Sequence, residues 1–131
     1  DNLKSKYKNK EFELIGYSGG GAVALLLATK RDDISNITTI AGNLDTAKWT
    51  SIHKISPLSN SLHPANYPNK LEHIAQHHLI GSEDKIMPKE ILLSYMANFK
   101  NKQNIRYSVH KATHSDGWVE VYREFFGKGK L

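Results

Sequence analysis

One stretch near the start of the chain, residues 12–21 (FELIGYSGGG), constrains the fold more than any other part of the sequence. Its first four residues are mostly apolar and predict a short buried strand, which ends at Gly16. The glycines that follow Ser18 lead into a second apolar run, residues 22–28 (AVALLLA), which predicts a buried helix. The stretch is therefore expected to turn sharply from a strand into a helix, with Ser18 at the tip of the turn.

Within this turn, Gly16-Tyr17-Ser18-Gly19-Gly20 fits the pattern G-x-S-x-G, in which the serine hydroxyl is exposed on a strained backbone. A side chain two residues before or after the serine is expected to collide with the strand or the helix, which explains Gly16 and Gly20. The positive end of the helix dipole and the free N–H groups of its first turn would stabilise an oxyanion there. The Gly19 N–H is thus a candidate oxyanion donor. The simpler interpretation is a glycine-rich turn with a surface serine.

Strands and helices alternate along the rest of the chain. We predict strands at residues 12–15, 34–41, 77–81 and 104–109, and helices at residues 19–30, 69–75, 88–99 and 118–126. This alternation predicts an α/β fold of about four parallel strands with helices on both faces. The helix at 19–30 is apolar nearly all round, so it should be covered on more than one side. The most amphipathic helix, 88–99, has one apolar face, formed by Ile91, Leu92, Tyr95, Met96 and Phe99. In the last helix, Trp118, Tyr122, Phe125 and Phe126 should point inward.

Length and composition set further limits. The 131 residues suffice for a single domain over residues 1–131 with a modest core, and residues 1–10 and 127–131 are expected to be frayed ends. The net charge of +5 comes from dispersed lysines, which indicates a solvated surface and not a nucleic-acid-binding face. There is no cysteine, and no apolar run is long enough for an integral membrane segment. No targeting segment is visible, so the sequence leaves the cellular compartment open. Since the chain starts at Asp1, we expect it to be processed or part of a longer protein.

Two later motifs follow predicted strands in the same way as Ser18. Residues 79–88 (LIGSEDKIMP) contain G-x-x-D-x-x-x-P, with Asp84 as its acid, and residues 112–118 (ATHSDGW) contain H-x-x-G-W, with His114 as its histidine. Loops at the carboxyl ends of parallel strands converge on one edge of the sheet. Ser18, Asp84 and His114 can therefore meet there.

A serine turn followed by an acid and then a histidine resembles the α/β-hydrolase superfamily of serine esterases and lipases. The resemblance covers nearly the whole chain from Glu11 onward, but only the C-terminal half of that fold, so it implies an incomplete α/β-hydrolase domain. It implies a serine hydrolase of small-molecule carboxylic esters or thioesters, with Ser18 as nucleophile, His114 as base and Asp84 as triad acid. Such a reaction passes through an acyl-enzyme and implies no metal and no organic cofactor.

Three alternatives stay open at this point. Asp45 follows the second strand, where some family members carry the triad acid, so it is a rival to Asp84; Asp45 or Asn43 also suits the cap of a helix that starts there. The spacing of His73 and His77 raises a metal site, but it fits no known ligand motif, so we expect none. The third alternative is an inactive remnant or a partner-dependent fragment, because residues 1–10 cannot supply the family's second oxyanion donor. The sheet would then have an open edge through which the chain could associate.

Overall fold

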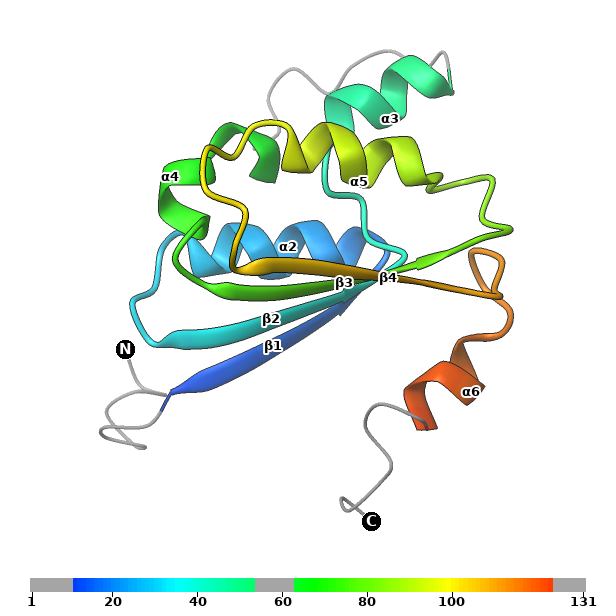
Figure 1. The fold of residues 1–131 in the computed structure, drawn as a ribbon, viewed down its shortest axis with the longest axis horizontal. Helices are drawn as coiled ribbons and strands as arrows, with labels where there is room; N and C mark the ends of the chain where they lie inside the picture. The colour runs from blue at the N-terminus through cyan, green and yellow to red at the C-terminus, as the bar shows by residue number, and fades with distance from the viewer. Residues whose placement is uncertain (1–10, 54–62, 124–131) are drawn as a thin grey trace.

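The computed structural model describes residues 11–53 and 63–123, and four parallel strands form one sheet at its centre (Figure 1). The sheet order β1-β2-β3-β4 follows the chain, with strands Phe12–Tyr17, Ile34–Ile40, Ala75–Gly81 and Ile105–His110. The expected frayed ends, residues 1–10 and 127–131, lie outside the described residues.

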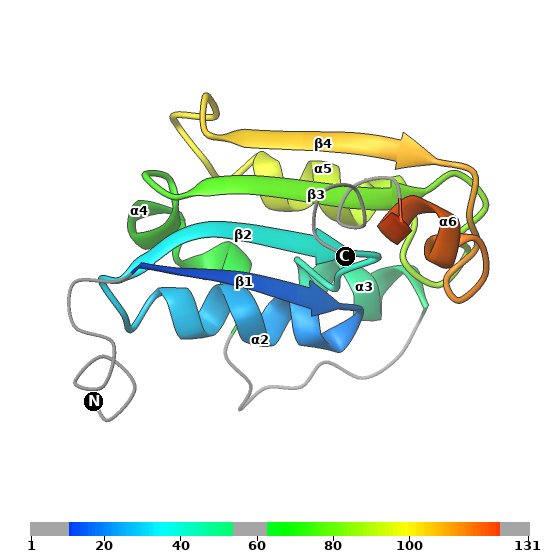
Figure 2. The ribbon, with the colours of Figure 1, turned by 90° about the horizontal axis from the view of Figure 1, so that it is seen from below.

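Helices cover the two faces of this sheet unequally. Because the strand order advances in one direction and crossovers in parallel sheets are right-handed, the connecting helices all lie on one face. These are α2 (Gly19–Ala28), α3 (Thr46–Ile52), the 3-10 helix η1 (Pro64–Asn66), α4 (Pro68–Leu71) and α5 (Lys89–Met96). After the last strand, α6 (Trp118–Tyr122) lies on the other face, near the carboxyl ends of the strands (Figures 1 and 2). The predicted class, four parallel strands with helices on both faces, is confirmed.

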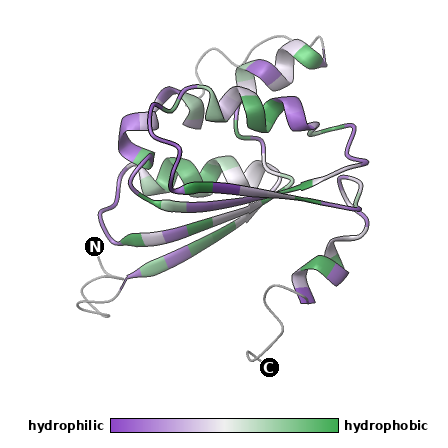
Figure 3. Cartoon of the chain, viewed as in Figure 1, coloured by the Kyte–Doolittle hydropathy of each residue, from purple (hydrophilic) through white to green (hydrophobic). Residues whose placement is uncertain are grey.

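The main apolar core lies between the sheet and the connecting helices, where Figure 3 shows hydrophobic segments facing each other. The predicted apolar face of α5 is confirmed, since Ile91, Leu92 and Tyr95 are buried and Met96 packs partly buried against the core; Phe99, which lies beyond the end of the helix, is buried as well. A smaller cluster on the opposite face joins α6 to the sheet and consists of Ile40, Ala41, Leu79, Ala112, Trp118 and Val121.

Two expectations about apolar burial are wrong in the described part of the chain. Val23 and Leu27 of α2 are 65% and 43% exposed, because α2 lies beside β1, at the edge of the sheet, and is covered mainly on its sheet side (Figure 2). Tyr122 is 50% exposed, because the short helix α6 buries only Trp118 and Val121. Phe125 and Phe126 lie outside the described residues.

A buried hydrogen-bond network under α5 links three elements. The Gln76 side-chain oxygen accepts from the Tyr95 hydroxyl at 2.8 Å and from His78 Nε2 at 2.9 Å. His78 Nδ1 therefore accepts from the Thr39 hydroxyl, 2.6 Å away, so the ring is neutral with its proton on Nε2. Both ring nitrogens of the neutral His78 therefore have a hydrogen-bond partner.

We expect the free energy of unfolding to fall in mild acid because of His78. Burial, with a smaller contribution from neighbouring His77, lowers the pKa of His78 from 6.5 to about 3. Below pH 6.5 the unfolded chain binds this proton and the folded chain does not, so stability declines down to about pH 3. Between pH 7 and pH 5 this single group should cost about 2 kcal/mol.

Urea unfolding at both pH values tests this expectation. His78→Gln should reduce the loss of stability between pH 7 and pH 5, whereas the same change at exposed His73 should leave it as in the wild type. An identical pH dependence in the wild type and His78→Gln would contradict it.

Candidate active site

The turn between β1 and α2 places Ser18 at the carboxyl edge of the sheet. Its backbone has φ 53° and ψ −122°, a conformation that non-glycine residues rarely adopt. Hydrogen bonds of both main-chain groups of Ser18 fix the turn: its N–H donates to the Ile40 carbonyl at 2.9 Å, and its carbonyl accepts from the Asn43 N–H at 3.2 Å. This turn therefore presents the serine hydroxyl from a rigid position.

The two glycines that flank Ser18 differ in their surroundings. A Cβ on Gly16 would lie 2.3 Å from the Gly20 carbonyl oxygen, so β1 and α2 pass too closely for any side chain there. A Cβ on Gly20 would meet no described atom within 4 Å. The expectation of a collision at Gly20 is wrong, because a side chain there would point away from the strand. The close contact belongs to position 16 alone, whose Cβ would collide with the main chain of Gly20.

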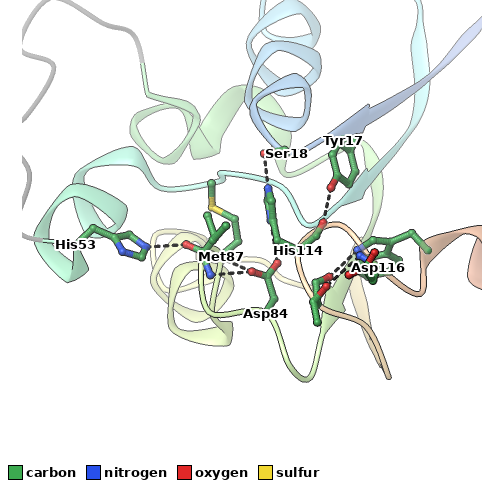
Figure 4. Close-up of polar contacts among 10 residues, drawn as sticks. Tyr17, Ser18, His53, Asp84, Met87, His114 and Asp116 are labelled. Atoms are coloured by element: carbon green, nitrogen blue, oxygen red, sulfur yellow. Dashed lines mark hydrogen bonds and ion pairs between the residues drawn. The ribbon is translucent and has the colours of Figure 1, made fainter.

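The three side chains singled out by the motifs meet in one hydrogen-bonded chain (Figure 4). Ser18 Oγ lies 2.9 Å from His114 Nε2, and His114 Nδ1 lies 3.1 Å from Asp84 Oδ2. The Asp84 side chain is fully buried, whereas the His114 side chain is 17% exposed. With the Nδ1–H directed at the carboxylate, the lone pair of Nε2 is free to accept the serine proton.

The loop after β3 fixes the orientation of the Asp84 carboxylate. Its Oδ1 accepts the N–H groups of Ile86 at 2.9 Å and Met87 at 2.7 Å, which leaves Oδ2 for His114. His53, at the end of α3, donates from Nε2 to the Ile86 carbonyl at 2.7 Å and ties this loop to the helix. The carboxylate is thus held by backbone donors on one oxygen and by the imidazole on the other.

The loop after β4, residues 111–117, carries His114 toward Ser18. Its turn is closed by hydrogen bonds between Thr113 and Asp116, both 3.0 Å long, and the Trp118 indole donates to the Thr113 carbonyl at 2.9 Å. The Tyr17 hydroxyl donates to the main-chain carbonyl of His114, and the two rings lie 5.6 Å apart (Figure 4). His114 is therefore contacted by Tyr17, the last residue of β1, and by Ser18, the residue that follows it.

The structure places the rival acid elsewhere. Asp45 caps α3, where its Oδ1 accepts the Lys48 N–H at 3.1 Å and its Oδ2 accepts the Ser94 hydroxyl at 2.5 Å. Both carboxylate oxygens are occupied by groups of α3 and α5, and Asp84 is the carboxylate that contacts His114.

The Gly19 N–H lies next to Ser18, and an open hollow lies next to His114. Gly19 is the first residue of α2, and its N–H makes no hydrogen bond within the part of the chain that the structure describes. An open hollow of about 340 Å³ borders His114 and is lined by Glu83, Lys85, Ile86, Thr113 and Ser115.

Among residues 11–53 and 63–123, no cluster of three or more histidine or acidic side chains could hold a metal ion, and no helix could span a membrane.

Sequence reasoning missed two side chains that contact this site. Tyr17 occupies a variable position of the G-x-S-x-G pattern, so its only signal is its place next to Ser18. His53 lies 33 residues before Ile86, to which it donates, and nothing local in the sequence marks that contact.

Comparisons with known proteins place the fold. No protein-family model matches the sequence, and no curated protein matches it either. Solved structures do match. An esterase of Pyrococcus furiosus has a TM-score of 0.73 at 20% identity, over 95% of this chain and 56% of the esterase. A monoacylglycerol lipase of Paleococcus ferrophilus has a TM-score of 0.65 at 16% identity, over 94% of this chain and 69% of the lipase. Mouse alpha/beta hydrolase domain-containing protein 10 has a TM-score of 0.57 at 16% identity, over 86% of this chain and 59% of that protein.

At these identities the similarity shows the fold alone, and the chain spans little more than half of the Pyrococcus esterase. The four parallel strands, their helices and these structural matches together show that the chain has the fold of the α/β hydrolases, over about half the length of those proteins.

Proposed function

We propose that this chain carries the catalytic triad of a serine hydrolase that cleaves a small-molecule carboxylic ester or thioester. The observation that carries the proposal is the continuous hydrogen-bonded chain from Ser18 through His114 to Asp84. It begins on a serine with positive φ at the start of a helix, a strained conformation of the kind that clusters at active sites. Two of the structural matches are an esterase and a lipase, which supports the same class of reaction.

Each side chain has a defined task in this reaction. His114 Nε2 takes the proton from the Ser18 hydroxyl as the oxygen attacks the carbonyl carbon, and the Asp84 carboxylate stabilises the imidazolium that forms. The Gly19 N–H donates to the oxyanion of the tetrahedral intermediate. The intermediate expels an alcohol or thiol, which receives the proton from His114, and a water molecule activated by the same base then cleaves the acyl-enzyme.

A second candidate is a chain that has this triad but needs a partner for turnover, or has lost activity. It is favoured by the number of oxyanion donors, since we identify one, Gly19, among the described residues. In serine hydrolases with two oxyanion donors, the loss of one donor costs about 3–4 kcal/mol of transition-state stabilisation. The phosphonylation of Ser18 by a fluorophosphonate, a reagent of high intrinsic reactivity, separates an activated serine from an inactive one.

The test is intact-mass spectrometry after incubation with a fluorophosphonate, on the wild type and on Ser18→Ala. We expect one adduct on the native wild type, none on Ser18→Ala, and none on the wild type unfolded in urea. A folded wild-type protein that gains no adduct would overturn the proposal of an activated serine and favour the inactive remnant. Adduct formation without turnover of any ester or thioester would favour the partner-dependent form.

A further inference from the structure

The end of β1 holds His114 by two different parts of the residue. Ser18 contacts the imidazole ring at Nε2, and Tyr17 donates its phenol proton to the main-chain carbonyl of the same histidine. These two residues are adjacent, so a single backbone segment sets the position of the serine hydroxyl and of the loop that carries the histidine (Figure 4).

The sheet order makes this second contact important for geometry. β1 and β4 are the two outer strands of the sheet, about 14 Å apart at ~4.8 Å per strand. The loop after β4 must reach across the ends of β3 and β2 before His114 can contact Ser18. Its main-chain hydrogen bonds join it to the loop after β3 and to α6: the Ala112 carbonyl accepts from the Glu83 N–H at 3.0 Å, and the Thr113 carbonyl accepts from the Trp118 indole.

Among the described residues, the Tyr17 hydrogen bond is the one that ties the backbone of this loop to the serine turn. The other hydrogen bonds of the loop join it to itself, to the loop after β3 or to α6. Without the Tyr17 hydroxyl, no hydrogen bond would fix the loop backbone to the serine turn, and only the ring contact with Tyr17 and the hydrogen bond between Ser18 and the His114 ring would remain. The Ser18 hydrogen bond breaks as the serine proton is transferred, so it cannot hold the loop in place during the reaction.

We propose that Tyr17 is a positioning residue, whose hydroxyl holds the loop of residues 111–117 so that His114 Nε2 stays within hydrogen-bond reach of Ser18. This inference rests on the proposed roles of Ser18 and His114. Tyr17 is 45% exposed, so its hydroxyl adds little to stability, and its removal should change the rate of the reaction and not the fold. Small displacements of reacting groups can lower rates by one to two orders of magnitude.

The test compares Tyr17→Phe with Tyr107→Phe, the same change at a 40% exposed tyrosine of β4. For the 131-residue chain, the fluorophosphonate reaction gives the inactivation rate constant and the reagent's dissociation constant separately. Tyr17→Phe should lower the rate constant about tenfold and leave the dissociation constant within about twofold, because positioning acts on the chemical step. Tyr107→Phe should change neither, and both variants should unfold at the temperature of the wild type.

A second measurement does not depend on reactivity. The NMR signal of the His114 Cε1–H, assigned with His114→Gln, should shift or broaden in Tyr17→Phe, while the signal of His53 stays in place. A wild type that gains no adduct at all would defeat the proposed function, and the NMR comparison would still decide the role of Tyr17. An unchanged His114 signal overturns the inference, as does a rate loss matched by an equal loss of thermal stability.

Discussion

Asp84→Asn should lower the rate at which a fluorophosphonate labels Ser18 by about four orders of magnitude while the chain stays folded. The amide oxygen can still accept the Ile86 and Met87 N–H groups, so the loop keeps its shape. The amide nitrogen, however, would take the place of Oδ2 and donate to His114 Nδ1. That reversal moves the imidazole proton from Nδ1 to Nε2, the nitrogen that faces Ser18. Nε2 then has no lone pair with which to accept the serine proton.

The matched control is Asp45→Asn, the same chemical change at a carboxylate of equal burial. Asp45 is 7% exposed and Asp84 is 6% exposed. Asparagine is as good a helix cap as aspartate, so this variant should keep both its stability and a labelling rate within about twofold of the wild type. Labelling rates with a fluorophosphonate, measured beside urea unfolding, check both variants. A large fall in the labelling rate of Asp45→Asn with little effect in Asp84→Asn would show that Asp45, and not Asp84, is the triad acid.

Gly16→Ala should lower the free energy of unfolding by about 3 kcal/mol or more, a large part of the 5–15 kcal/mol typical of a domain. The new Cβ would lie 2.3 Å from the Gly20 oxygen, 2.6 Å from its carbonyl carbon and 2.7 Å from Gly21 Cα. All three atoms belong to the backbone of α2, so no side chain can move aside. The methyl group must push the helix away from β1.

Gly20→Ala is the matched control, because it adds the same methyl group on the other side of Ser18. Its Cβ meets nothing within 4 Å and lies inside α2, so alanine should raise the free energy of unfolding by up to about 1 kcal/mol. Urea unfolding of the two variants should therefore give changes of opposite sign. Equal destabilisation by both would show that the close approach of β1 and α2 does not limit position 16.

Much of the fold could be predicted from local patterns. The turn around Ser18, the apolar face of α5 and the alternation of strands and helices depend on residues close together in the sequence, and these predictions are confirmed. The boundaries differ by a few residues, as at α2, which ends at Ala28 and not at Lys30. Helix ends depend on capping contacts that periodicity does not report.

Expectations that depended on burial were less accurate. The apolar sequence around Val23 and Leu27 predicted a helix covered on more than one side, but composition cannot say that α2 lies at an edge of the sheet. Conversely, His78 is completely buried, although the pair His77-His78 looks polar in the sequence. Burial keeps the ring neutral, and the hydrogen-bond network around it includes Thr39, Gln76 and Tyr95, which come from three elements.

The sequence by itself determined the strand-turn-helix around Ser18, the class of the fold and the three motif residues that could meet at one edge of the sheet. It could do so because parallel strands end at a common edge, whatever their spacing in the chain. The tertiary structure alone decided that Asp84, and not Asp45, contacts His114, and that the Tyr17 hydroxyl donates to the main-chain carbonyl of the same histidine. Those outcomes depend on the order of strands and the path of loops across their ends, which join residues that no local pattern relates.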